Sequence, residues 1–233
     1  SSPVLPHLIR WAQKLGEVMV VVPKYEQSGK SHSIELHKPF EVLACDRFPG
    51  VRTYTVDSSP ADCVRFGTSG LHQTYDLILS GINRGYNLGD DIAYSGTVGA
   101  IMEGGRLGIP SVALSTDVDT LDTALAQLDV WWDYMTTHSL LTKCPLYNVN
   151  FPQEADCKGV CLTYQGGEFY SDAFEYRGDD MYMQTGAPVH YDRCDLSIDI
   201  DATRAGYISV TPMTFNKTDF GILKSLRNGD SQA

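Results

Sequence analysis

The 233-residue chain lacks several features that would each point to a class of protein. No apolar run approaches the roughly 20 residues that a membrane-spanning helix needs, so we expect no membrane partner. Basic residues are few: 18 Lys and Arg stand against 29 Asp and Glu, and the formal charge is −11. So acidic a surface repels polyphosphate backbones, and we expect no polymeric nucleic acid as a partner. A small phosphorylated substrate is still compatible with this negative charge, because a bound metal ion or a helix N-terminus can make one site locally positive.

The six cysteines lack the spacing of a zinc site. Only Cys157 and Cys161 lie close together, as CKGVC, with no second pair or histidine cluster beside them. We therefore expect reduced thiols and a cytoplasmic protein. His32 and His37 flank one expected strand at an odd spacing, which places them on opposite faces and excludes joint binding of one ion.

Short apolar strands alternate with helical patterns, and this predicts a three-layer, doubly wound, mainly parallel (Rossmann-like) α/β sheet. Length favours a single domain over residues 1–233. Expected strands cover 17–23, 33–44, 51–56, 76–79, 109–115, 148–152 and 207–212. Expected helices cover 6–15, a segment after 58–62, 97–106, a segment from 119–120, and 217–228.

After about residue 154 the pattern changes, because large aromatic residues stand among acids and glycines without a helical period. Two interpretations follow from this composition. The segment is either a β-rich excursion packed on its own core, or an exposed aromatic arm that is buried against another subunit.

The stretch 76–104, DLILSGINRGYNLGDDIAYSGTVGAIMEG, carries the clearest functional signal. A short apolar strand leads into a glycine-rich polar segment, and Ser95-Gly96-Thr97 then begins a helix. Such a layout suits an anion, because glycines allow close approach and the first helical N–H groups point at the ligand. Asn83 and Asn87 add neutral groups for a metal or phosphate. The alternative is an ordinary strand-to-helix connection.

Within this stretch, GINRGYNLGDD followed by YSGTVGAIMEG resembles the SurE family, stationary-phase survival proteins that act as metal-dependent nucleotidases. Further matching segments are VVVPKYEQSGKSHSIELHKP (20–39), SSPADCVRFG (58–67), NVNFP (148–152) and AGYISVTPM (205–213). The resemblance covers nearly the whole chain. It implies hydrolysis of nucleoside monophosphates to nucleoside and phosphate by a 5′-nucleotidase, with 3′ cleavage left open.

By motif position, the resemblance implies that Ser28 and Asn83 bind a metal, one divalent Mg²⁺ or Mn²⁺ per subunit. It implies that Asn87 and the turn Ser95-Gly96-Thr97 hold the substrate phosphate. The family opens with a strand ending in an Asn-Asp-Asp-Gly turn whose aspartates bind the metal. No such turn occurs here, so we expect that strand and the catalytic aspartates to precede Ser1.

Two neutral oxygens do not hold a divalent cation in water without carboxylates. If the paired aspartates are absent altogether, the alternative is a catalytically silent nucleotide or phosphate sensor of the same fold. The resemblance also favours the arm interpretation, with residues of about 155–200 exchanged between subunits of a homodimer or homotetramer.

Other polar residues near the motifs have weaker assignments. Adjacent carboxylates point apart, so we interpret one of Asp90 and Asp91 as a cap and the other as a surface residue. Asp62 or Ser59 caps a helix. Lys30 and Arg84 either steer an anion or are merely solvated.

A rival function is a dinucleotide-dependent oxidoreductase, since the fold class suits it. The fingerprint G-x-G-x-x-G is missing, and Gly81, Gly85 and Gly89 are spaced four apart instead. No Ser/His/Asp or Cys/His nucleophile pattern stands out either.

Overall fold

The computed structural model describes residues 3–191 and 193–229. Its strands are β1 (Met19–Pro23), β2 (Val42–Ala44), β3 (Arg52–Val56), β4 (Ile78–Arg84), β5 (Ser111–Thr116), β6 (Leu146–Phe151), β7 (Val160–Leu162), β8 (Ala173–Gly178), β9 (Met181–Thr185) and β10 (Ile208–Met213). Its helices are α1 (Leu5–Ala12), α2 (Pro60–Arg65), η1 (Phe66–Gly70), η2 (Gly89–Tyr94), α3 (Gly96–Leu107), α4 (Leu121–Thr137), α5 (Leu140–Lys143), α6 (Asp199–Arg204) and α7 (Phe220–Gly229).

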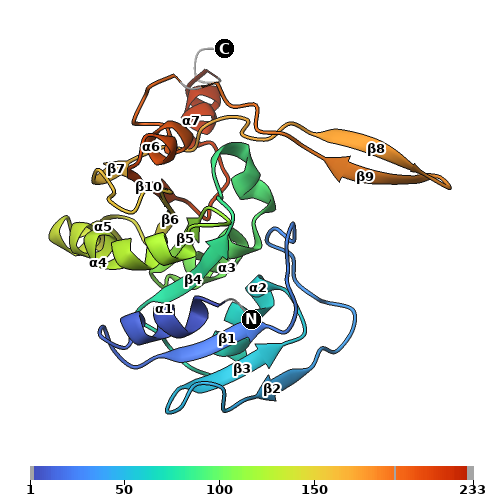
Figure 1. Ribbon diagram of the computed structural model, residues 1–233, viewed down its shortest axis with the longest axis vertical. Helices are drawn as coiled ribbons and strands as arrows, with labels where there is room; N and C mark the ends of the chain where they lie inside the picture. The colour runs from blue at the N-terminus through green and yellow to red at the C-terminus, as the bar shows by residue number, and fades with distance from the viewer. Residues whose placement is uncertain (1–2, 192, 230–233) are drawn as a thin grey trace.

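Two sheets and one separate hairpin hold these strands. The larger sheet has the order β4-β5-β6-β10-β7, in which β4, β5 and β6 run parallel and β10 is antiparallel to β6. The smaller sheet has the order β1-β3-β2, with β1 parallel to β3. Helices pack against the sheets, and the expected mainly parallel α/β class is confirmed (Figure 1).

The main core lies between the larger sheet and α4. Every residue of β5 and β6 is buried, and Trp131 of α4 packs against Phe151 of β6 with ring centroids 6.3 Å apart. Helix α1 adds Trp11, whose ring lies 5.8 Å from that of Trp131. Both strands are thus buried on both faces, as is usual for parallel strands covered by helices.

The same helices cover both sheets. In α1, Ile9 packs with Val20 of β1, while Leu8 joins the cluster that contains Ile82 of β4. On another side, α2 packs on β1 and on α3, and α3 packs on β4 and β5. The described residues pair β1 only with β3 and β4 only with β5, so each sheet presents a partly buried edge under these helices.

Strand pairing departs from the expectation in the segment 33–44. Only Val42–Ala44 forms a strand, and His32 and His37 flank no strand, so that prediction was wrong. Side chains take the backbone donors there: Glu35 N–H donates to Asp62 Oδ2 at 2.9 Å, and His37 N–H donates to the Glu35 carboxylate at 2.8 Å. These local hydrogen bonds compete with a strand ladder.

A second departure concerns β4, which was expected to end at residue 79. The strand continues to Arg84 and contains the SGIN motif, with a register shift between Ser80 and Asn83 against β5. Gly81 lies at this shift with φ +134°, and a Cβ there would lie 2.3 Å from the Leu114 carbonyl oxygen. Only glycine fits such a bulge.

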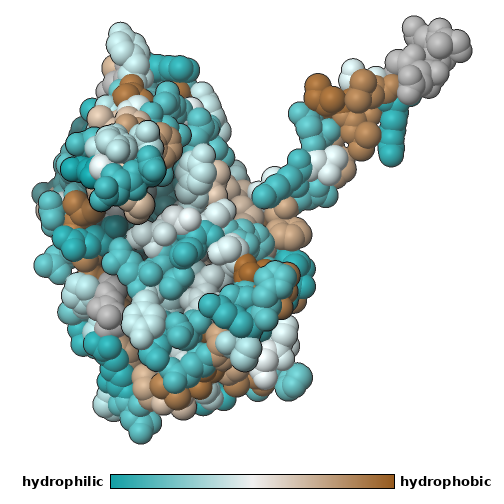
Figure 2. Space-filling view, turned by 90° about the vertical axis from the view of Figure 1, so that its right-hand side faces the viewer, coloured by the Kyte–Doolittle hydropathy of each residue, from teal (hydrophilic) through white to brown (hydrophobic). Residues whose placement is uncertain are grey.

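The segment after residue 154 divides into two parts. Strand β7 joins the larger sheet beside β10, whereas β8 and β9 form a hairpin that extends away from the body (Figure 1). Helix α7 also projects from the body, and Figure 2 shows apolar residues along it. None of the helices in the described ranges is long and apolar enough to cross a membrane.

Candidate functional site

The N-terminus of α3 is built as a closed turn. Ser95 is the N-cap, and its Oγ accepts a hydrogen bond from Val98 N–H at 3.1 Å, the geometry that stabilises a helix start. The next residue, Gly96, is closely surrounded by other segments. A Cβ at this position would lie 3.1 Å from Pro60 Cγ and 3.3 Å from the Gln27 carbonyl oxygen. The loop that carries Ser28 therefore lies directly against this helix end.

Further contacts hold the loop of residues 27–33 on α3. Ser31 N–H donates to the Tyr94 carbonyl at 2.9 Å, and Ser31 Oγ donates to the Ala93 carbonyl at 2.6 Å. The Ser31 backbone also lies over Gly99, where a Cβ would approach the Ser31 carbonyl oxygen to 2.3 Å. The structure thus brings the loop that carries Ser28 and the turn Ser95-Gly96-Thr97 into one region.

A buried carboxylate anchors the same loop from below. Glu103 of α3 is 4% exposed, and it lies 2.8 Å from His32 Nε2, 2.9 Å from Arg106 Nε and 3.4 Å from an Arg65 nitrogen. Burial opposes the charge of Glu103, but the hydrogen bonds from Arg106 and His32 outweigh it and hold the pKa of Glu103 below its ordinary value of 4.5. The loop is therefore tied to the helix by a charged cluster as well as by its backbone.

Asn87 is fixed by side chains of the neighbouring strands. Asn87 N–H donates to Asn150 Oδ1 at 2.9 Å, and the Asn87 carbonyl accepts from Asn148 Nδ2 at 2.8 Å and from Asn150 Nδ2 at 3.0 Å. Its own Nδ2 donates to Ser115 Oγ at 2.6 Å. Asn87 is therefore held by four hydrogen bonds, which fix its orientation in the loop after β4.

Ser115 also connects the two asparagines of the motif. Asn83, the penultimate residue of β4, pairs with Ser115 of β5, and the Asn87 side chain bonds to the Ser115 hydroxyl from the loop that follows. Asn83 Nδ2 donates to the Gly85 carbonyl at 2.8 Å, so the Asn83 side chain folds over the start of this loop. Asn83 and Asn87 are therefore both neighbours of Ser115, one through strand pairing and the other through a side-chain hydrogen bond.

Beyond Asn87, the loop is fixed by α6 and by the segment before β8. Gly89 N–H donates to Asp199 Oδ2 at 3.0 Å, and Asp90 N–H donates to the Gly167 carbonyl at 3.0 Å. Asp199 is fully buried. Burial raises the pKa of Asp199, and hydrogen bonds from the backbone N–H groups of Gly89, Gly166 and Ile200 oppose that rise.

The metal ligands predicted from the resemblance are neutral oxygens. Ser28 is exposed and its Oγ donates to Glu26 Oε1 at 2.8 Å, while Asn83 is half-buried. Within residues 3–191 and 193–229, no three His, Cys, Asp or Glu side chains gather as a metal site. The residues described here therefore do not fit a divalent cation by themselves, because such an ion needs carboxylates.

The remaining predicted polar residues have structural environments. Ser59 caps α2, and the buried Asp62 accepts from Ser58 Oγ and from Glu35 N–H. Neither Asp90 nor Asp91 caps η2 with its side chain, so the expected cap there was wrong. Burial and the nearby Asp90 raise the pKa of Asp91.

The Arg84 side chain is bonded to the segment that follows β5. Its Nε donates to the Val118 carbonyl at 2.7 Å, and a terminal nitrogen lies 3.7 Å from Asp119. The exposed Lys30 lies in the loop that carries Ser28. Both basic groups that the sequence singled out stay close to predicted site residues, since Arg84 follows Asn83 at the end of β4 and Lys30 lies two residues after Ser28.

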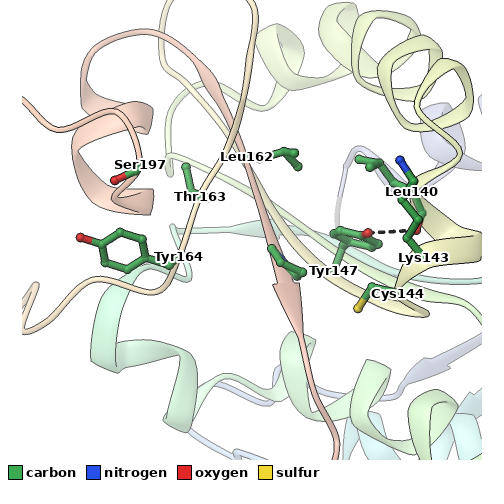
Figure 3. Close-up of a pocket in the computed structure, with 9 residues that line it drawn as sticks. Leu140, Lys143, Cys144, Tyr147, Leu162, Thr163, Tyr164 and Ser197 are labelled. Atoms are coloured by element: carbon green, nitrogen blue, oxygen red, sulfur yellow. Dashed lines mark hydrogen bonds between the residues drawn. The ribbon is translucent and has the colours of Figure 1, made fainter.

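A separate cavity lies between α5, β7 and the end of β10 (Figure 3). Leu140, Leu162 and Tyr164 line it, and Tyr147 OH donates to the Leu140 carbonyl at 2.9 Å. It contains none of the predicted site residues and no carboxylate. We therefore place the candidate site at the carboxyl ends of β4 and β5, where ligands bind in open α/β sheets.

Sequence reasoning missed several residues that build this site. Asn148 and Asn150 carried a signal, because two polar residues at a spacing of two mark one face of an otherwise apolar strand. Ser115 and Glu103 gave a weaker signal as polar residues within apolar segments. Asp199 gave none, because its contact with Gly89 spans 110 residues of sequence.

Comparisons with known proteins agree with the motifs. The family profile described as "Survival protein SurE" matches residues 1–172. The chain is 36% identical over 219 residues to "5′-nucleotidase SurE" of Caldanaerobacter subterraneus subsp. tengcongensis, covering 90% of this chain and 85% of that protein. It is 38% identical over 238 residues to the protein of the same name in Paramagnetospirillum magneticum, covering 97% and 90%.

The fold has a solved counterpart as well. The crystal structure of the SurE protein from Aquifex aeolicus superposes with a TM-score of 0.79 at 30% identity, covering 98% of this chain and 95% of that one. The family-profile match over residues 1–172 includes the strand, loop and helix that form the candidate site. The chain belongs to the SurE family.

Proposed function

We propose that this protein hydrolyses nucleoside monophosphates to nucleoside and phosphate, as a 5′-nucleotidase. One observation carries the proposal: the loop that carries Ser28 lies against the capped N-terminus of α3, and Asn87, in the loop between β4 and α3, is fixed on β5. Relatives at 36–38% identity bear the name 5′-nucleotidase, which supports the same assignment.

In this proposal, Asn87, Ser95, Gly96 and Thr97 bind the substrate phosphate. The helix end offers backbone N–H groups and a favourable dipole for a dianion, and hydroxyl and amide groups add hydrogen bonds. Ser95 is already used as the cap, so its backbone geometry orients the N–H groups that follow.

The proposal includes one divalent cation per subunit, Mg²⁺ or Mn²⁺, which would neutralise the phosphoryl oxygens and supply a bound water. Ser28 and Asn83 are its proposed ligands in this chain. Because both are neutral, we propose that paired aspartates ahead of Ser1 complete the ligand set. The half-buried edges of β1 and β4 support this, since one further strand between them would join the two sheets.

The full-length protein tests this function. We expect it to release phosphate from purine nucleoside monophosphates with added Mn²⁺ or Mg²⁺ and to stop with EDTA. Asn83→Ala should abolish most of this rate, because removing one ligand weakens metal binding. Gln73→Ala is the matched control, an exposed amide that also bonds to nearby backbone but lies in the turn before β4.

Two results would contradict the proposal. Turnover that survives thorough chelation would exclude the metal-dependent mechanism, and wild-type turnover in Asn83→Ala would show that the metal site is misplaced. Tight nucleotide binding without hydrolysis in the full-length protein would instead favour the silent nucleotide sensor.

We also propose that the protein forms a homodimer or homotetramer through the arm of residues 155–200. Phe174 is 69% exposed and Tyr182 is 66% exposed, on a hairpin that pairs with neither sheet. A lone two-stranded hairpin is marginal in water, and a second copy would cover these rings. Phe220 and Leu226 on the projecting α7 add apolar surface of the same kind (Figure 2).

A cytoplasmic location is the last part of the proposal. Free thiols at Cys45, Cys63, Cys144, Cys157 and Cys161 support a reducing compartment.

A further inference from the structure

Asp199 joins two segments that lie far apart in the sequence. Its Oδ2 accepts from Gly89 N–H at 3.0 Å, while its Oδ1 accepts from Gly166 N–H at 2.8 Å and from Ile200 N–H at 2.9 Å. Gly89 belongs to the loop that follows Asn87, and Gly166 belongs to the root of the arm. One buried carboxylate therefore holds both segments.

The two segments also touch directly. A Cβ on Gly89 would lie 2.1 Å from the Gly167 carbonyl oxygen, and Asp90 N–H donates to that same carbonyl. Behind them, Leu88 packs in one buried cluster with Phe169 and Ile200. The loop and the arm root are therefore a single packed unit without space for independent movement.

The arm root is continuous with the exposed hairpin. Val189 N–H donates to the Phe169 carbonyl at 2.9 Å, and Ser171 N–H donates to the Ala187 carbonyl at 2.9 Å. These bonds join the two legs of the arm just before β8 begins. A displacement of the hairpin is thus transmitted to Phe169 and Gly167, which contact the loop.

We propose that Asp199 is a positioning residue which makes the phosphate-binding loop depend on the seating of the arm. The inference rests on the proposed function, in which Asn87 binds phosphate. Asn87 lies two residues before Gly89. The segment 87–89 is thus held at Asn87 by Asn148 and Asn150 and at Gly89 by Asp199, and loss of the Asp199 contact would free its Gly89 end. The position of the arm root, which an exchange of arms between subunits would fix, would then determine how tightly the loop of Asn87 binds phosphate.

The variant Asp199→Asn isolates this link. The single amide oxygen would keep the two donors on the Oδ1 side, Gly166 and Ile200, and the NH₂ group would then face Gly89 N–H. Two donors cannot bond to each other, so the Gly89 contact is the one that is lost.

Asp201→Asn is a matched control on the same helix. Asp201 is equally buried, and its Oδ2 accepts from Arg193 N–H and Asp195 N–H while its Oδ1 bonds to His190 Nε2. In Asp201→Asn, the amide oxygen still accepts from Arg193 N–H and Asp195 N–H, and the amide NH₂ group donates to His190 Nε2 once that nitrogen carries no proton. Asp201 makes no hydrogen bond to the loop of Gly89 among its contacts.

Two measurements on the full-length protein test the proposal. Amide exchange at Gly89, followed by NMR, should accelerate in Asp199→Asn and stay at the wild-type rate in Asp201→Asn. With Mn²⁺ present, the inhibition constant for inorganic phosphate and the KM for nucleotide should both rise about tenfold in Asp199→Asn, the loss expected for one buried hydrogen bond to a charged group. Phe169→Leu, a milder loosening of the arm root, should move both quantities in the same direction if Asp199→Asn does not fold.

The outcomes separate this inference from the proposed function. Faster exchange at Gly89 with unchanged phosphate affinity would overturn the positioning role. Equal losses in Asp199→Asn and Asp201→Asn would show a general loss of stability instead of a link to the loop. A wild-type protein that binds no phosphate would overturn the proposed function, while the exchange of Gly89 would still report whether Asp199 holds the loop.

Discussion

Substituting Gly99 by alanine tests whether the loop of residues 27–33 must lie tight on α3. A Cβ at position 99 would lie 2.3 Å from the Ser31 carbonyl oxygen and 3.0 Å from His32 Cα. Ordinary contact begins at 3.4 Å, so the loop would have to move outward by about 1 Å. Backbone atoms cannot rotate away as a flexible side chain would, and the whole loop with Ser28 would shift.

The magnitude follows from two opposing effects. Alanine in a helix interior is favoured over glycine by about 0.5–1 kcal/mol. Overpacking against backbone costs about 1–3 kcal/mol. We therefore expect a net loss of about 1 kcal/mol in the free energy of unfolding, too little to unfold the protein. Activity should fall far more, because a misplacement of about 1 Å at a reacting site reduces the rate on the order of a hundredfold.

Gly105→Ala is the matched control. It makes the same substitution in the same helix, but its Cβ would meet the side chain of Leu146 in the core at 2.5 Å. Urea denaturation should show a loss of stability in both variants, and phosphate release from a nucleotide should fall only in Gly99→Ala. Equal activity in the two variants would refute the claim that the loop position matters for function.

Two further predictions concern charge and assembly. Because the pKa of Glu103 lies below its ordinary value of 4.5, the ionised carboxylate stabilises the folded state above that pH, and this stabilisation is lost as the pH falls further. In Glu103→Gln, the stability measured by urea midpoints should therefore depend less on pH between about pH 5 and 3. An unchanged pH dependence would show that the charged cluster around Glu103 does not contribute to stability. Replacing residues 172–186 by a short Gly-Ser turn should convert the protein to a monomer in light scattering, since Ser171 and Ala187 are already hydrogen-bonded neighbours, whereas a monodisperse monomer with the arm intact would show that the exposed rings need no second copy.

Much of the fold could be predicted from the sequence, because local pattern and burial agree there. Helix α3 starts at Gly96, one residue from the expectation, because Ser95 is a good cap ahead of an apolar helical pattern. Strands β5 and β6 are buried at every position, and the short apolar segments within them are what the sequence pattern detects. The class and the order of these elements followed from this pattern.

The errors arise where side chains or distant segments decide the structure. Residues 33–41 alternate like a strand, yet Asp62 takes the backbone donor of Glu35 from another part of the chain. The SGIN motif has the composition of a loop, but a bulge at Gly81 keeps it within β4. A local sequence pattern does not reveal contacts between residues that are far apart in the chain. For the same reason the sequence did not predict the contact of Asp199 with Gly89 in the loop after Asn87.

The polar interior of the central sheet has a consequence for engineering. Ser115, Asn148, Asn150, Ser209 and Thr211 are at most 2% exposed, in strands that they share with buried aliphatic and aromatic residues. Asn148 Oδ1 has no hydrogen-bond partner among the described residues, a direct cost in stability. A consensus or cavity-filling redesign would rank these positions first for replacement by Val or Leu. The resulting protein would melt later and lose the supports of Asn87, so heat resistance and catalysis compete for the same strand.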